Sequence, residues 1–96
     1  MAAREVLAQI SLYLGAAEER LGAGAQRTRV AIRRARVRIE GLLGELPIVE
    51  GPAEGAPLAH LEEADALARK HLGEAGMEGQ IRRAVGEALS AVREEA

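Results

Sequence analysis

Apolar residues recur through the first half of the chain at alternating steps of three and four, which is the spacing of one face of an α-helix. The stripe has the heptad form that helices use to pack on one another. Its members are Leu7, Ile10, Leu14, Ala17, Leu21, Gly24, Thr28, Ala31, Ala35, Leu42 and Leu46. No segment alternates with a period of two over the length of a strand. The sequence therefore predicts an all-α fold, a bundle of three or four amphipathic helices.

Residues 3–46 allow two interpretations. In the first, Gly22-Ala23-Gly24 ends one helix and begins another, because glycine is the usual residue just past a helix end and costs about 1 kcal/mol inside a helix. In the second, a single helix of about 44 residues runs through the glycines and is roughly 65 Å long. Such a rod would need a partner to cover it. The unbroken stripe favours the rod and the glycines favour the hairpin, which is our preferred interpretation.

The second half of the chain contains two further amphipathic segments. Residues 47–57 hold three prolines and two glycines and are predicted to form an exposed loop. Pro57 suits the first turn of the helix that follows. The expected apolar faces are Leu58, Leu61, Ala64, Ala68, Leu72 and Ala75 in one helix, and Met77, Ile81, Ala84, Val85, Ala88, Leu89 and Val92 in the other. Residues 1–96 are thus one helical domain: a hairpin or long helix at 1–46, a loop at 47–57, and a second hairpin at 58–95.

The apolar residues of this chain are mostly small. Alanine supplies 20 of the 46, and Tyr13 is the only aromatic residue. Because buried area drives folding and alanine buries little, the helices must pack closely or share their core with another chain. We therefore expect self-association to complete the bundle. The residues predicted to form the helix-packing interface are Leu7, Ile10, Leu14, Leu21, Ala31, Ala35 and Leu42.

An arginine cluster is the feature that points most directly to a function. It lies within 19 residues that contain no acid and comprises Arg20, Arg27, Arg29, Arg33, Arg34, Arg36 and Arg38. At 100° per residue, helical geometry places Arg27, Arg34 and Arg38 in a first row. Arg29, Arg33 and Arg36 form a second row, with the apolar stripe between the two. Residues 1–46 carry eight basic and five acidic side chains, whereas residues 47–96 carry five and ten. The first half is therefore basic and the second acidic.

Three interpretations of the arginine cluster compete. The acidic half supplies carboxylates, and charges that flank an apolar stripe commonly set helix pairing, which favours ion pairs within the chain or between subunits. Arginines on a helix can also bind a nucleic-acid backbone with strong salt dependence, although the chain lacks aromatic residues that stack on single-stranded bases. Docking to anionic lipid is disfavoured because the flanked stripe is rich in alanine.

The sequence offers few side chains for catalysis or metal binding. Cysteine is absent, and His60 and His71 are 11 residues apart on one helix, too far for a shared zinc ion in one chain. We expect both histidines to be partly exposed at the edge of an apolar face. The adjacent acids Glu18-Glu19, Glu62-Glu63 and Glu94-Glu95 are interpreted as solvated helix faces, because neighbouring residues on a helix diverge.

These observations predict a non-enzymatic helical interaction or assembly protein with no cofactor or metal. Its partner would be a second copy or another protein, chosen by the arginine rows. The alternative is a small nucleic-acid-binding protein or ribonucleoprotein subunit that uses the Arg27–Arg38 cluster. The sequence shows neither a signal-peptide layout nor an apolar run of about 18 residues that could span a bilayer. We therefore expect a cytoplasmic location.

Overall fold

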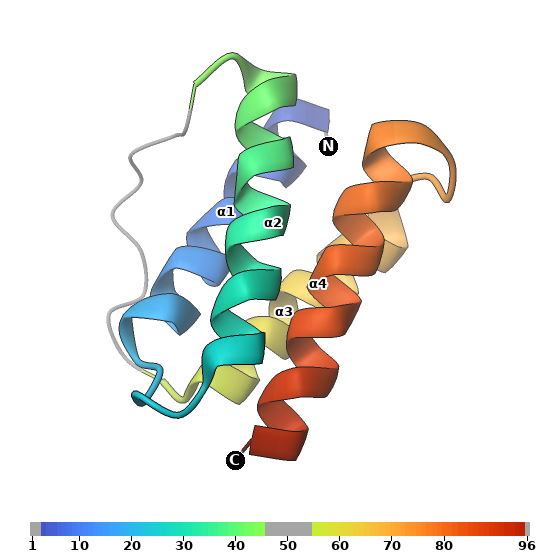
Figure 1. The fold of residues 1–96 in the computed structure, drawn as a ribbon. Coiled ribbons are helices and arrows are strands. Elements are labelled where there is room, and N and C mark those ends of the chain that lie inside the picture. Colours follow the sequence, from blue (N-terminus) through green and yellow to red (C-terminus); the bar gives the residue numbers. More distant parts are fainter. Residues whose placement is uncertain (1–2, 46–54, 96) are drawn as a thin grey trace.

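The computed structural model describes residues 3–45 and 55–95, which form four α-helices and no strand (Figure 1). Helix α1 spans Ala3–Glu19, α2 spans Gln26–Leu43, α3 spans Pro57–His71 and α4 spans Gly76–Glu95. The all-α prediction is confirmed. Helix α3 begins at Pro57, the position expected from proline's missing amide hydrogen. The rest of the loop predicted at 47–57 lies outside the described residues, apart from positions 55 and 56.

The helices form a closed arrangement in which each packs against two others. Helix α1 packs on α2 and α3, and α4 packs on α2 and α3, whereas α1 and α4 lie on one diagonal and α2 and α3 on the other. In Figure 1, α1 and α2 stand side by side, α4 lies beside α2, and α3 lies behind. Helix α2 therefore has two neighbours, one close in sequence and one distant.

The chain reverses direction between α1 and α2. The amide of Leu21 donates to the carbonyl of Glu18 (3.3 Å), and the amide of Ala25 donates to that of Gly22 (3.2 Å), so that residues 20–25 form a turn. Residues 3–43 thus form a hairpin and not a single long helix. Gly24, a predicted member of the stripe, lies exposed in this turn, whereas the buried stripe members on the two helices face one core.

Most of the residues predicted as a helix-packing interface form the core of the chain itself. Their exposed fractions are between 0 and 4% for Leu7, Ile10, Leu14, Ala31 and Ala35. Leu21 is partly buried against this core. These side chains are packed within one chain and are not available to a partner in this fold.

Leu42 is an exception, because it is 42% exposed and Leu43 is the buried residue instead. The buried positions of α2 run through Ala35, Ile39 and Leu43 in steps of four. A straight helix repeats every 3.6 residues, so its buried face drifts away from a strict heptad. Leu58 and Met77, each the second residue of its helix, are 37 and 40% exposed and lie outside the faces expected for α3 and α4.

Alanine makes close packing possible within the single chain. Residues with no exposed surface include Ala17, Ala35, Ala64, Ala68 and Ala88. They come from all four helices, so small side chains bring the helices together around a common core. The small side chains predicted either close packing or a core shared with another chain, and the structure shows close packing. Self-association stays a prediction.

Candidate interaction surface

The arginines of α2 leave the helix on both sides of its buried stripe. Ala31, Ala35 and Ile39 face the core, and they separate the first row (Arg27, Arg34 and Arg38) from the second row (Arg29, Arg33 and Arg36). Each row reaches a different neighbour of α2. The second row extends to α1 and the turn before α2, and the first row extends to α4.

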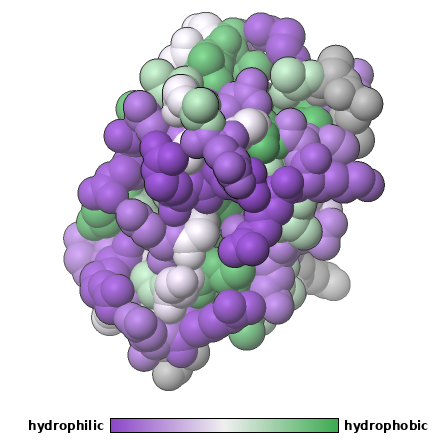
Figure 2. All heavy atoms as spheres, turned by 90° about the vertical axis from the view of Figure 1, so that its right-hand side faces the viewer, coloured by the Kyte–Doolittle hydropathy of each residue, from purple (hydrophilic) through white to green (hydrophobic). Residues whose placement is uncertain are grey.

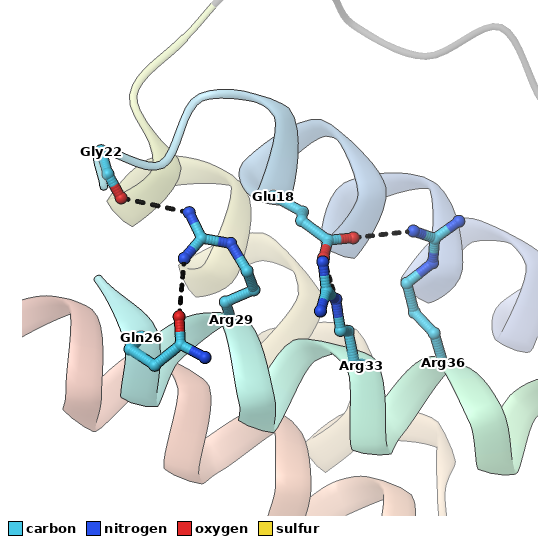
Figure 3. A network of polar contacts seen from close by, with 6 residues as sticks. All are labelled: Glu18, Gly22, Gln26, Arg29, Arg33 and Arg36. Atoms are coloured by element: carbon cyan, nitrogen blue, oxygen red, sulfur yellow. Dashed lines mark hydrogen bonds and ion pairs between the residues drawn. The ribbon is translucent and has the colours of Figure 1, made fainter. Parts of the chain in front are cut away.

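The second row converges on one carboxylate. Glu18 accepts from Nε of Arg33 through Oε2 (2.9 Å) and from Nη1 of Arg36 through Oε1 (3.1 Å). Figure 3 shows the Glu18 side chain lying between the two guanidinium groups. The side chains of Glu18 and Arg36 are only 18 and 27% exposed, so this bridge is sheltered from water. It joins the end of α1 to the middle of α2.

Arg29 fastens the start of α2 to the turn that precedes it. Its Nη1 donates to Oε1 of Gln26 (3.2 Å), and its Nη2 donates to the carbonyl of Gly22 (3.1 Å), as Figure 3 shows. Arg20 lies just past α1 and belongs to neither row; it also takes part in a polar interaction. The sequence grouped Arg20 with the cluster, but the structure separates it from the two rows on α2.

The first row runs antiparallel along α4. Nη1 of Arg27 contacts Oε2 of Glu94 (2.6 Å), and Nη1 of Arg34 contacts Oε2 of Glu87 (3.1 Å). Nε of Arg38 donates to the Gln80 side chain (2.8 Å). The hydrogen bond to Glu94, together with the charge of that carboxylate, raises the pKa of Arg27 above its usual value. These side chains are exposed, at 48 to 67% in the two ion pairs.

Thr28 anchors the beginning of α2 to the end of α4. Its amide and its hydroxyl each donate to Oε1 of Glu95 at 2.9 Å. The residue before α2, Ala25, provides no side-chain cap. A carboxylate from another helix therefore satisfies one of the amide groups that a helix leaves unpaired at its start.

The sequence anticipated carboxylate partners for the arginines in the acidic half, but it did not single out Glu87 and Glu94, and it missed Glu18 in the basic half. Glu18-Glu19 and Glu94-Glu95 were interpreted as solvated faces, which is wrong for Glu18 and Glu95 because both are partly buried and bond to α2. Glu94 is 61% exposed, as expected, and also contacts Arg27. A signal was present for the last pair. Two acids at the C-terminal end of a helix oppose the macrodipole of that helix, which indicates a partner elsewhere.

The side of α2 that faces away from the core remains uncovered by the described residues. Val30 is 44% exposed and Val37 is 66% exposed. They are one heptad apart, with Arg33 and Arg34 between them. We call Val30, Arg33, Arg34 and Val37 the α2 strip. The two valines of this strip form a second, smaller apolar stripe on α2, whose main apolar stripe is buried.

A shallow groove of about 660 Å³ adjoins the α2 strip, between α2 and α4. Its lining includes Arg27, Val30 and Arg34 of α2, Gly86 and Glu87 of α4, and Arg69 of α3. Figure 2 shows the side of the molecule on which α4 lies, where hydrophilic side chains surround a narrow band of small and apolar residues. Arginine side chains therefore line the groove from two helices, and Glu87 lies beside them.

The two histidines differ from the sequence-based expectation. His60 is buried, at 6% exposed, and its ring lies 6.2 Å from that of Tyr13, whereas His71 is exposed. Within residues 3–45 and 55–95, Nε2 of His60 has no hydrogen-bond partner, and three or more metal-ligating side chains do not gather anywhere. His60 is a core residue of the α1–α3 contact.

The comparisons with known proteins do not assign a family. No protein-family model, curated protein or solved structure matches this chain. None of the helices in the described part of the chain is both long enough and apolar enough to cross a membrane. The surface of the bundle therefore carries the evidence for function.

Proposed function

We propose that this chain is a non-enzymatic interaction protein that binds its partner through the α2 strip. The observation that carries the proposal is the exposure of Val30 and Val37, 44 and 66%, one heptad apart between guanidinium groups. Single exposed apolar residues are common on protein surfaces. Two at heptad spacing with flanking charges form the pattern by which one helix recognises another.

The contacts of the arginines refine the mechanism expected from the sequence. Both rows engage α1 and α4 of their own chain, so their first role is to hold α2 in place. Arg33 and Arg34 still have side chains 66 and 48% exposed. Since a guanidinium has five N–H donors, it can donate to a second carboxylate beside the first. A partner with acidic side chains beside a small apolar stripe fits this surface.

Binding to a nucleic acid is the second candidate, and the groove beside α2 favours it. Arg27, Arg34 and Arg69 line the groove from two helices, and a row of guanidinium groups attracts phosphates. Glu87 lies in the same groove, and Glu94 is bonded to Arg27. These carboxylates repel a polyanion and weaken this alternative.

A titration with two probes separates the candidates. The first probe is a designed helical peptide with glutamates flanking a heptad-spaced alanine stripe, and the second is a DNA duplex; both are added at about 50 and 200 mM salt. We expect the peptide to shift amide NMR signals of α2. We expect weak binding of DNA. Tight DNA binding that falls by orders of magnitude between the two salt concentrations, without peptide binding, would overturn the proposal.

A pair of variants assigns the binding to the strip. V30S/V37S removes the apolar contacts and leaves every arginine in place, so we expect peptide affinity to fall by at least about tenfold, since fully burying one valine contributes about 1.5 kcal/mol or more. L42S is the matched control, because Leu42 is also exposed on α2 but lies outside the strip. Equal losses in the two variants would contradict the assignment.

A further inference from the structure

Helix α3 carries an outward strip with the same spacing as the α2 strip and the opposite charge. Ala59 and Ala66 are one heptad apart, with Glu62 and Glu63 between them. All four residues are exposed. We call them the α3 strip. On α2, the corresponding positions are occupied by valine, two arginines and valine.

The correspondence continues beyond these four positions. Adding 29 to each residue number of the α2 strip gives the α3 strip, and it also aligns Glu40 with Arg69, which lies next to Lys70. In a parallel alignment of the two helices, arginines therefore come level with glutamates, and a glutamate comes level with two basic residues. Opposite charges on facing helices favour their pairing and set its register.

The two strips cannot meet within one molecule. Helices α2 and α3 lie on a diagonal of the bundle and do not pack on each other. Their outward faces therefore point to opposite sides of the molecule. In Figure 1, α2 and α3 both run from the bottom of the view toward the top, with α3 tilted. A parallel contact between α2 of one copy and α3 of the next thus relates the copies by a shift and a twist.

We propose that the partner of the α2 strip is the α3 strip of a second copy of this chain, an inference that rests on the proposed function. The contact joins two different surfaces and leaves one free strip at each end. Such head-to-tail contacts add further copies and produce open chains or filaments where the rotation does not close a ring. A symmetric contact between two α2 strips is disfavoured, because it brings Arg33 and Arg34 against the same residues of the partner.

The contacts already present leave room for this docking. Glu62 has a side chain that is 53% exposed and lies 3.6 Å from Arg93, and Arg69 is 67% exposed beside Asp65. Exposed ion pairs of this kind contribute little to stability and exchange readily. A contact between two single helices is at the small end of interface sizes. We therefore expect association at high micromolar concentrations that weakens as salt rises.

A charge-swap experiment tests the proposal by sedimentation velocity of the full chain. We expect the average mass of the wild-type protein to rise with concentration. R33E/R34E and E62R/E63R should each remain monomeric, since each sets like charges against like. An equimolar mixture of the two variants should associate again, because the reversed strips are complementary. R82E/R83E, which reverses an adjacent pair of arginines on α4, is the matched control and should behave as the wild type.

A second variant, A66R, distinguishes loss of association from misfolding. R33E/R34E also removes ion pairs to Glu18 and Glu87, whereas A66R changes an exposed alanine of the α3 strip and should abolish association in a chain with unchanged circular dichroism. A wild-type protein that stays monomeric, or a mixture that fails to associate, overturns the head-to-tail contact. If that monomer binds the acidic peptide, the proposed function survives, and its partner is another protein.

Discussion

Helix α2 has two seams of ion pairs, and they are built differently. On the α1 side, one carboxylate, Glu18, serves two arginines and is only 18% exposed. On the α4 side, Arg27 and Arg34 each have a carboxylate of their own, and all four side chains are 48 to 67% exposed. Both sides pair arginine with glutamate. They differ because the carboxylate on the α1 side is sheltered from water and is shared by two arginines, whereas each carboxylate on the α4 side is exposed and serves one arginine.

This contrast predicts an unequal division of stability between the seams. Exposed ion pairs contribute from 0 to about 1 kcal/mol, since water screens them and two long side chains lose freedom. A hydrogen bond to a charged group in a sheltered place contributes roughly 1.5 to 3 kcal/mol when its removal leaves the partner unsatisfied. The α1 seam should therefore be stabilising, whereas the exposed pairs on the α4 side mainly select the register.

The largest expected effect comes from Glu18→Ala. It removes both acceptors from Arg33 and Arg36, and it leaves a guanidinium of which Nε is already buried without a partner among the described residues. We expect the free energy of unfolding to fall by about 2 kcal/mol in urea denaturation. Glu19→Ala is the control, because Glu19 is the exposed neighbour. Equal small losses in the two variants would remove the distinction between the seams.

Thr28→Val tests a sheltered polar contact on the α4 side. Thr28 has no exposed surface, and valine keeps its shape while losing the hydroxyl that donates to Glu95. We expect a loss of about 1 kcal/mol from the missing hydrogen bond, whereas Thr28→Ser keeps the hydroxyl and its loss reports the removal of a buried methyl group. Urea denaturation of both variants measures both losses. A stable Thr28→Val protein would mean that the amide contact to Glu95 is sufficient.

The smallest effect is expected for Glu87→Gln, which neutralises the partner of Arg34. We expect a loss of about 0.3 kcal/mol that disappears in 0.5 M NaCl, since both side chains are exposed and screened. Thermal unfolding at low and high salt measures the difference. A loss above about 1 kcal/mol at both salt concentrations would show that exposure is a poor guide in this seam.

Helical geometry alone was sufficient to predict the two arginine rows. Their separation depends only on the rotation of 100° per residue, so Arg29 and Arg34 must point to different sides of α2. The helix that each row meets depends on the order of the helices in the bundle. Sequence spacing does not contain that order, because α2 reaches α4 across more than fifty residues.

The limits of the heptad pattern explain the remaining differences. The stripe predicted most of the core from Leu7 to Ala35, except the exposed Gly24 and the partly buried Leu21. It placed Leu42 inside, because a heptad assumes 3.5 residues per turn. Val30 and Val37 are spaced one heptad apart, as a minor apolar face of a helix would be, and both are exposed. The α3 strip has the same spacing, but the sequence alone does not show that the α2 and α3 strips lie on opposite outer sides of the bundle.

The cap from Glu95 to Thr28 has a consequence for the order of synthesis. Helices α1 and α2 leave the ribosome before α4 has been made, so the hairpin emerges with Glu18 available but without Glu87, Glu94 or Glu95. The first row of arginines is then unneutralised, and α2 has no cap at its start. Contacts between such distant segments form late. Residues 1–46 carry eight basic and five acidic side chains, so the nascent hairpin is cationic, and its first row of arginines gains the carboxylates of α4 only after α4 has been made.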